Sequence, residues 1–334
     1  ETSDGIDNDC DGIDGIDEDG DGYSAISSGG DDCDDLDKHI HPYDLDGDGS
    51  SDGCGWQDIS AGRWHSCGID SSGSIRCWGD DNYNQLDAPE EGTFTQVSAG
   101  YWHSCAVDTS GSAVCWGKGD DERTSPPSSI SFVQVSAGDR HSCGITVDAE
   151  VACWGCGVGS TCAGNDVGQA SNAPSGTGFV EVRAGGYYSC ALHESGEAQC
   201  WGSNTYGHQD IPTNTNFQQI DAKWLYSACG ITDSEEIQCW GDVYTDLVVP
   251  TGTFTQVGVG YLHLCALGAD GLVTCAGYNS FNQVTDTPTD FFTRISAGYF
   301  HNCGIDTTGH LQCWGAGDGS STGSEHHQDQ SLHP

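Results

Sequence analysis

The sequence predicts an all-β fold built from seven copies of one short unit. First, fourteen of the cysteines form seven pairs, and the two members of every pair are ten residues apart. Second, the first cysteines of these pairs recur at intervals of 38, 38, 47, 39, 36 and 38 residues. Third, every unit begins with an aromatic residue followed three positions later by Ile or Val. A period of this length is typical of propeller blades and solenoid repeats.

The cysteine pairs predict one stapled β-hairpin in each unit. Between the paired cysteines the residues alternate in polarity and break at a polar turn, which places the two thiols opposite each other on antiparallel strands. Two thiols per unit without a CxxC pairing make a tetrahedral metal cage hard to complete, so disulfides are favoured over seven metal sites. The predicted pairs are Cys67 with Cys77, Cys105 with Cys115, Cys143 with Cys153, Cys190 with Cys200, Cys229 with Cys239, Cys265 with Cys275, and Cys303 with Cys313.

Further residues recur at fixed offsets within the unit. Five units have Gly one position past the midpoint of the hairpin, which fits a three-residue turn with Gly in the left-handed conformation, whereas Ala149 and Glu235 depart from this pattern. Trp-Gly follows the second cysteine in six units, and these tryptophans are expected to pack in the interior. Unit five is irregular, because it reads Ala222-Lys223 where most units have Ala-Gly and it contains one extra residue.

The unit from Phe94 to Trp116 resembles the repeat of the regulator of chromosome condensation family in its short, disulfide-bearing bacterial form. Four linkers also resemble that family's Asn-x-x-Gly-Gln element, and they are residues 81–85, 165–169, 204–208 and 279–283. The resemblance covers about residues 55 to 316 and implies a seven-bladed β-propeller. Period and pairing alone leave an open solenoid possible, but the absence of a polar capping unit favours a closed ring.

Histidine stands two residues before the first cysteine in five units, at His65, His103, His141, His263 and His301. In a propeller these positions form a ring, which would allow a metal or ligand site on the axis. A buried imidazole that satisfies backbone groups in each blade is the favoured interpretation, because a repeated position usually serves the repeat.

The charge and cysteine content exclude several classes of protein. The chain has 9 Lys+Arg against 51 Asp+Glu and a formal net charge of −42, so it lacks the basic stripe that nucleic acids or anionic membranes require. No apolar run is long enough for a transmembrane helix.

Nineteen cysteines predict an oxidising compartment, and we expect a mature, exported protein of extracellular localisation, secreted or on the cell surface. Cys156 and Cys162 are expected to close a further disulfide in the longest linker.

Residues 1–55 differ from the repeats and are predicted to be a short, irregular calcium-binding segment. Alternate carboxylates followed by Gly let several oxygens converge on one hard cation, as in calcium loops. The segment resembles the Asp/Cys-rich metal-binding motif of secreted proteins. A plain solvated acidic tail is the alternative. The candidate Ca²⁺ ligands are Asp7, Asp9, Asp11, Asp14, Asp17, Asp19, Asp21, Asp44, Asp46, Asp48 and Asp52.

The same segment contains an odd number of cysteines, Cys10, Cys33 and Cys54. Cys10 and Cys33 are expected in a disulfide, although which of the three is unpaired stays open. An unpaired cysteine suggests self-assembly through an intermolecular disulfide. Residues 56–316 form the predicted propeller, and residues 317–334 read as a polar tail.

No catalytic residues emerge from the sequence. The single G-x-S-x-G string, at residues 49–53, lies in an Asp-rich loop without the strand and helix of a nucleophile elbow. We therefore expect a non-enzymatic, extracellular, calcium-binding propeller that serves adhesion, matrix or surface and filament assembly by binding a protein or a cell-surface ligand. The alternative is a secreted inhibitor or ligand-capturing module that binds its partner through one propeller face, as the resemblance to secreted propeller inhibitors implies.

Overall fold

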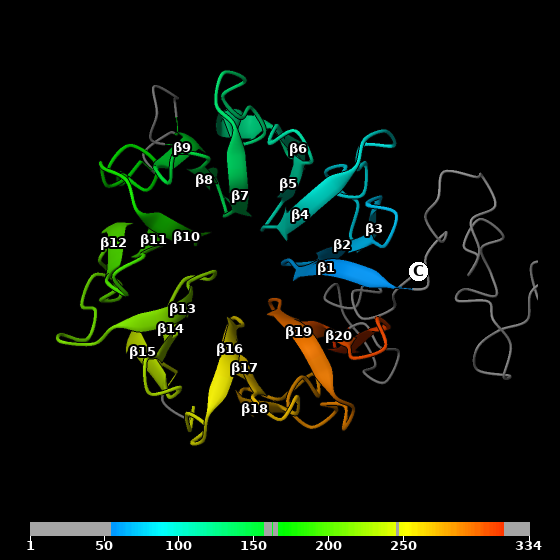
Figure 1. Cartoon of the computed structure of the whole chain (residues 1–334), viewed down its shortest axis with the longest axis vertical. Coiled ribbons are helices and arrows are strands. Elements are labelled where there is room, and N and C mark those ends of the chain that lie inside the picture. The colour runs from blue at the N-terminus through cyan, green and yellow to red at the C-terminus, as the bar shows by residue number, and fades with distance from the viewer. Residues whose placement is uncertain (1–54, 157–161, 163–165, 245–246, 317–334) are drawn as a thin grey trace, which may run out of the picture.

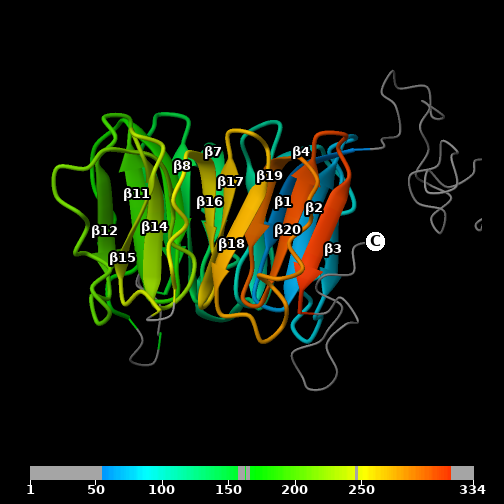
Figure 2. The ribbon, with the colours of Figure 1, turned by 90° about the horizontal axis from the view of Figure 1, so that it is seen from below.

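The structure is a computed structural model, and it describes residues 55–156, 162, 166–244 and 247–316. Seven three-stranded antiparallel sheets stand around a central axis as blades (Figure 1), which confirms the seven-bladed propeller. In each sheet the strands follow chain order, and the first strand lies next to the axis. Figure 2 shows that the strands run between two opposite faces of the ring.

The strands of the seven blades have nearly the same lengths. The inner strands are β1 (Trp56–Ala61), β4 (Phe94–Ala99), β7 (Phe132–Ala137), β10 (Phe179–Ala184), β13 (Phe217–Asp221), β16 (Phe254–Val259) and β19 (Phe292–Ala297). The middle strands are β2 (His65–Asp70), β5 (His103–Asp108), β8 (His141–Thr146), β11 (Tyr188–His193), β14 (Ser227–Thr232), β17 (His263–Gly268) and β20 (His301–Asp306). The outer strands are β3 (Ile75–Gly79), β6 (Ala113–Gly117), β9 (Val151–Gly155), β12 (Ala198–Gly202), β15 (Ile237–Gly241), β18 (Val273–Gly277) and β21 (Leu311–Gly315). One 3₁₀ turn, η2 (Asp120–Glu122), lies in the linker after β6.

Two faces of the ring follow from these strand directions. Face A carries the turns between inner and middle strands, at residues 62–64, 100–102, 138–140, 185–187, 222–226, 260–262 and 298–300. Face B carries the turns between middle and outer strands, at residues 71–74, 109–112, 147–150, 194–197, 233–236, 269–272 and 307–310.

Every repeated cysteine pair lies where the spacing predicts. Cys67 stands directly opposite Cys77 in the β2–β3 ladder, and the other six pairs have the same register. The Cα atoms of these pairs are 4.0–4.1 Å apart and the sulfurs are bonded. The structure also joins Cys156 to Cys162 in the linker after β9. The segment of Cys10, Cys33 and Cys54 lies outside the described residues.

The ring closes on itself, so the open solenoid is wrong. The first residue of each inner strand donates its backbone amide to the hairpin turn of the preceding blade, as when Phe94 donates to the Gly73 carbonyl at 2.9 Å. The same bond joins the last blade to the first, where Trp56 donates to the Gly309 carbonyl at 2.9 Å. Seven equivalent bonds therefore run round the ring. The ring therefore closes without a blade shared between the two chain ends, because every blade takes its three strands from one repeat.

The hairpin turns require the left-handed conformation in all seven blades. Gly73 has φ of 85°, and the two positions that lack Gly adopt it too, with φ of 60° at Ala149 and 63° at Glu235. This conformation is energetically unfavourable for an L-residue that has a side chain, because its Cβ approaches the following carbonyl oxygen.

Replacing either residue by glycine, Ala149→Gly or Glu235→Gly, is therefore expected to raise the free energy of unfolding by about 0.5–1 kcal/mol. Denaturant titration at neutral pH measures the change. Ala113→Gly in β6 is the matched control and is expected to lower stability, because glycine within a strand adds only chain entropy to the unfolded state. A loss of stability in both turn variants would contradict the strain assigned to these positions.

Candidate functional site

A ring of polar side chains around the axis fastens each blade to the next. The residue directly before the aliphatic position of each inner strand contacts the neighbouring blade. Gln96 Oε1 accepts the Val135 amide at 2.8 Å, and Gln134 Oε1 accepts the Val182 amide at 2.8 Å. The same contact is made by Asp58 to Val97, Glu181 to Ile220, Gln219 to Val257 and Gln256 to Ile295.

The seventh position of this ring is Arg294, whose side chain has no oxygen that could accept a hydrogen bond from a backbone amide. Its guanidinium instead pairs with Asp58 of the first blade, and the Ile59 amide donates to the same carboxylate. Burial raises the pKa of Asp58, while Arg294 and the two backbone amides act in the opposite direction. At this position of the inner strand, the last blade is joined to the first by an ion pair, whereas the other six junctions have a hydrogen bond from a backbone amide.

A second ring of side chains lies two residues further along each inner strand. Ser60 accepts the Ala99 amide, Ser98 accepts the Ala137 amide and Ser136 accepts the Ala184 amide, each at 2.9–3.0 Å. Ser296 accepts the Ala61 amide in the same way. Blades four and five have Arg183 and Asp221 at this level, and Asp221 accepts the Val259 amide.

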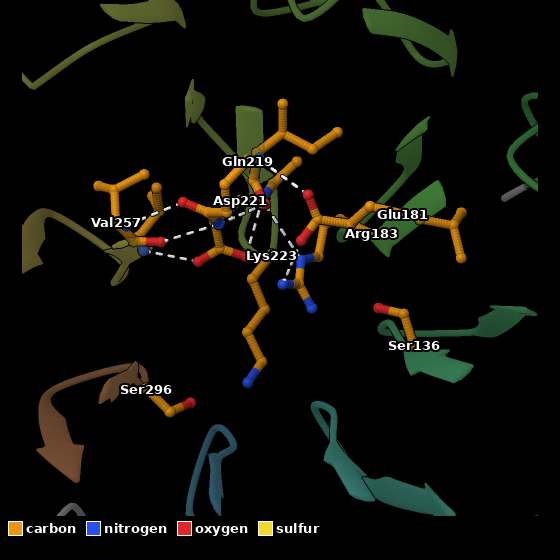
Figure 3. A network of polar contacts seen from close by, with 12 residues as sticks. Ser136, Glu181, Arg183, Gln219, Asp221, Lys223, Val257 and Ser296 are labelled. Atoms are coloured by element: carbon orange, nitrogen blue, oxygen red, sulfur yellow. Dashed lines mark hydrogen bonds and ion pairs between the residues drawn. The ribbon is translucent and has the colours of Figure 1, made fainter. Parts of the chain in front are cut away.

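The axial cavity enclosed by these rings has a volume of about 450 Å³ and contains opposed charges. Arg183 donates to Glu181 at 2.5 Å and lies 3.6 Å from Asp221 (Figure 3). Burial raises the pKa of Glu181, against the lowering effect of Arg183. Each carboxylate here contacts backbone amides and a guanidinium. The polar groups of the cavity therefore hold blades together.

Lys223 extends across this cavity from the fifth blade to the first (Figure 3). Its ammonium donates to the Ala61 carbonyl and lies 3.4 Å from Ser60 Oγ. Burial lowers its pKa to about 8, against the raising effect of Asp221. The irregularity of unit five thus supplies a cation to the axis.

The longer face-A turn of unit five, residues 222–226, also brings an aromatic ring against those of other blades. Trp224 is buried and contacts Tyr101 of the second blade, with ring centroids 5.0 Å apart, and Tyr299 of the seventh, at 5.3 Å. Trp64 belongs to the same buried cluster. We call Trp64, Tyr101, Trp224 and Tyr299 the axial plug. Rings from the face-A turns of the first, second, fifth and seventh blades therefore meet in it.

The five repeated histidines are buried and bridge blades. His65 Nε2 lies 2.7 Å from Ser104 Oγ, and His263 Nε2 lies 2.9 Å from Asn302 Oδ1. His103, His141 and His301 make the same contact with Ser142, Ser189 and Ser66 of the following blades. The buried role predicted for them is right, but their partner is a side chain of the next blade and not a backbone group. Burial lowers the pKa of these imidazoles, to about 3 at His65.

Linker elements between blades accept a hydrogen bond from the tryptophan in the outer strand of the following blade. The Gln85 carbonyl accepts Trp116 Nε1 at 2.8 Å, and the Gln169 carbonyl accepts Trp201 Nε1 at 2.9 Å. A further element, not among the four predicted from the sequence, lies between the second and third blades, where the Arg123 carbonyl accepts Trp154 Nε1 at 2.9 Å. Its signal was the spacing, because Arg123 precedes its tryptophan by the same 31 residues as Gln85 does.

A belt of aromatic side chains lies on face A around the axial plug. Tyr206, Tyr226 and Tyr261 follow one another with ring centroids 4.9 and 5.3 Å apart. Phe300 continues the belt, at 5.8 Å from Tyr261 and 4.7 Å from Phe281. Most of these rings are partly exposed, and Tyr206 and Tyr83 are 37% and 40% exposed. The sequence carried a signal for this belt, because every unit except the third has an aromatic residue directly before the histidine position or one residue earlier.

The predicted calcium ligands lie outside the described residues, so the structure does not place them. Within the described ranges, no three His, Cys, Asp or Glu side chains are grouped so that they could bind a metal ion. In the same ranges, no helix is long and apolar enough to cross a membrane.

The fold is that of a β-propeller, a class in which the members with this kind of repeat are mostly protein-interaction scaffolds. Six stretches of the chain match the regulator of chromosome condensation (RCC1) repeat, and together they cover just over half of it: residues 56–85, 94–122, 132–159, 179–207, 254–283 and 292–319. The chain belongs to this repeat family. The irregular fifth unit is outside these matches.

Solved propellers resemble the chain over most of its length. The CRINKLY WD40 ectodomain of the Arabidopsis thaliana receptor kinase ACR4 is 25% identical, with a TM-score of 0.64, over 78% of this chain and 96% of that one. The ectodomain of the Physcomitrella patens receptor kinase CR4 is 24% identical, with a TM-score of 0.63, over 79% and 74%. Saccharomyces cerevisiae Prp20p, studied for its binding to Gsp1p and histones, is 14% identical, with a TM-score of 0.61, over 72% and 80%. Among curated protein sequences, none is significantly similar to this chain.

Proposed function

We propose that this chain is a non-enzymatic, extracellular protein-binding module that binds its partner through face A and serves adhesion, matrix or surface assembly. The observation that carries the proposal is the partly exposed aromatic belt on that face. Tyrosine, tryptophan and arginine are enriched among the residues that supply most of the energy at protein interfaces. Tyrosine and tryptophan do so because their rigid rings bury large areas and lose few rotamers. The rings pack against one another before any partner arrives, so less conformational entropy is lost on binding.

The compartment is supported by the disulfides and by one relative. The disulfides of the blades persist only where thiols are oxidised. The solved structure that is 25% identical to this chain is the ectodomain of a receptor kinase.

Partner capture with face-specific variants tests the proposal. Wild-type protein is immobilised and exposed to extracellular material of the source organism, beside Tyr206→Ser/Tyr226→Ser on face A and Val133→Ser/Val180→Ser at the face-B ends of the inner strands β7 and β10. The exposed valines are the matched control. We expect one or more proteins to be retained by the wild type and the face-B variant, and a loss of affinity of about tenfold or more in the face-A variant. Retention that depends on the face-B valines, or on neither face, would contradict the proposal.

We further propose that residues 1–55 bind Ca²⁺ as a folding cofactor. The support is the alternation of Asp residues followed by Gly. Calorimetric titration of the full chain with calcium chloride is expected to give binding near ~10⁻⁴–10⁻³ M, as in extracellular modules. Asp44→Asn/Asp46→Asn/Asp48→Asn is expected to remove part of the heat. Absence of calcium-dependent heat in the wild type would refute this function of the segment without affecting face A.

A further inference from the structure

The two sides of face A differ in whether the chain supplies a cation to its own aromatic rings. Beside the first two blades, the Arg63 guanidinium carbon lies 4.6 Å from the Trp102 ring centroid and 5.0 Å from that of Tyr299. The Lys118 ammonium lies 4.4 Å from the ring centroid of Tyr83. These contacts are cation–π interactions, in which the negative face of the ring attracts a positive charge.

Beside the fifth and sixth blades, Lys223 lies 5.7 Å from the ring centroid of buried Trp224, but the three outer tyrosine rings have no such partner among the described residues. Tyr206, Tyr226 and Tyr261 form the continuous row described above, and among the described residues no Lys or Arg lies over any of the three. The chain has only 9 Lys and Arg in total, and four of them, Arg63, Arg183, Lys223 and Arg294, are already engaged in the plug or the axial cavity.

Two exposed carboxylates stand next to this row. The Asp242 amide donates to the Tyr226 carbonyl at 2.9 Å, and the Asp210 amide donates to Gly207, beside Tyr206, at 3.0 Å. In the described part of the chain, neither carboxylate forms an ion pair. The pKa of Tyr226 is raised by its hydrogen bond with Tyr261, by burial and by the negative charge of Asp242, which places that carboxylate close to the phenol.

We propose that a Lys or Arg side chain of a basic partner protein binds over Tyr206, Tyr226 and Tyr261, with Asp210 and Asp242 as its counter-charges. This inference rests on the proposed function and specifies the chemistry of the partner. The rings supply the cation–π attraction that Trp102 and Tyr83 supply to the chain's own cations. The net charge of −42 steers a basic partner toward the protein.

The geometry of the row favours a cationic side chain over a sugar. Tyr206 and Tyr226 are inclined at 74° to each other, and Tyr226 and Tyr261 at 50°. A polysaccharide stacks best on rings that lie side by side in one plane, whereas inclined rings enclose a compact charged group from several directions. Polysaccharide binding is therefore an outcome that the test must distinguish.

Binding to designed peptides tests the proposal on the full chain at physiological salt. The probes are an arginine–serine repeat peptide, the same peptide with each arginine replaced by the neutral isostere citrulline, and a glutamate–serine repeat of equal length. We expect the arginine peptide to bind and the other two to bind at least tenfold more weakly. Equal binding of the citrulline peptide, or measurable binding of a neutral polysaccharide with displacement of the arginine peptide, would overturn the proposal.

Paired variants separate this site from general attraction by an acidic protein. Tyr226→Leu removes the ring but keeps an apolar side chain, and it is expected to weaken the arginine peptide by about 2- to 5-fold, whereas Tyr226→Phe keeps the ring and should have no effect. Asp242→Asn is expected to weaken binding more than Asp233→Asn, a charge-matched change on the exposed face-B turn. Equal effects of Tyr226→Leu and Tyr226→Phe, or of the two Asp variants, would place the cation elsewhere.

The failure of this inference can be told apart from failure of the proposed function. If the natural partner is lost with the face-A variant but the arginine peptide does not bind, face A binds proteins without a cationic contact. If the natural partner depends on face B, the proposed function itself is wrong.

Discussion

Acidification from pH 7 to pH 5 is expected to remove most of the stability of the propeller. The buried imidazoles have pKa values of about 3 at His65, His141 and His301 and about 4 at His263, and burial also lowers the pKa of His103. In the unfolded chain each histidine titrates near ~6.5. Between these values, the unfolded state binds protons that the folded state does not, so stability falls as the pH falls.

The size of this effect follows from the five repeated histidines, and His208, which is also buried and has its pKa lowered by burial, adds to it. Each costs about 1.4 kcal/mol per pH unit below its unfolded pKa, so five together approach ~7 kcal/mol per unit once they are all charged in the unfolded chain. Burial raises the pKa of Asp58, Glu181 and Asp139, and these groups oppose the loss, because the folded state then takes up protons first. These three carboxyls are fewer than the five histidines, so we expect stability to fall between pH 6.5 and 5.

Denaturant titrations at pH 7, 6 and 5 measure the slope of unfolding free energy against pH. The matched variant is His263→Gln, whose amide can still donate to Asn302 and does not titrate. It is expected to reduce the slope by about one proton, or ~1.4 kcal/mol per pH unit. A stability that does not change between pH 7 and pH 5 would show that the five imidazoles are not buried and neutral.

Removal of the ring at the centre of the axial plug, Trp224→Ala, is expected to lower the free energy of unfolding by about 3–5 kcal/mol. Trp224 is only 1% exposed and contacts Tyr101 and Tyr299 from two other blades. The substitution opens a cavity that these rings cannot fill, since both are fixed by their own neighbours.

Denaturant titration at neutral pH measures this loss, with Tyr206→Ala as the control because Tyr206 is 37% exposed. The control is expected to cost less than about 1 kcal/mol. A replacement that keeps much of the volume, Trp224→Phe, should recover part of the loss. If Trp224→Ala and Tyr206→Ala are equally mild, the plug does not hold the blades together.

Much of the architecture could be read from local spacing. Cysteines ten residues apart meet across a hairpin because strand pairing around a short turn is a local event, as at Cys67 and Cys77. The left-handed turn was visible in five glycines, and the structure extends it to Ala149 and Glu235, where the backbone of the repeat overrides the preference of the residue.

The candidate site was less accessible from sequence, since its residues come from different blades. Arg294 and Asp58 are an ion pair although 236 residues separate them. Lys223 was recognised as an irregularity, but nothing local indicates that its ammonium reaches Ala61 of the first blade. The aromatic belt was visible as recurring Tyr and Trp residues, yet their association on one face depends on the closure of the ring.

The sequence by itself determined the unit, its disulfides, its number of copies and the acidic character of the chain, because each depends on residues close together or on simple composition. Only the tertiary structure decided what lies at the centre and on the faces. The physical reason is that inter-blade contacts join positions equivalent in the repeat but distant along the chain. The residue type at these positions varies, as from Gln96 to Glu181 to Arg294. Which group each side chain binds is decided only by the neighbouring blade.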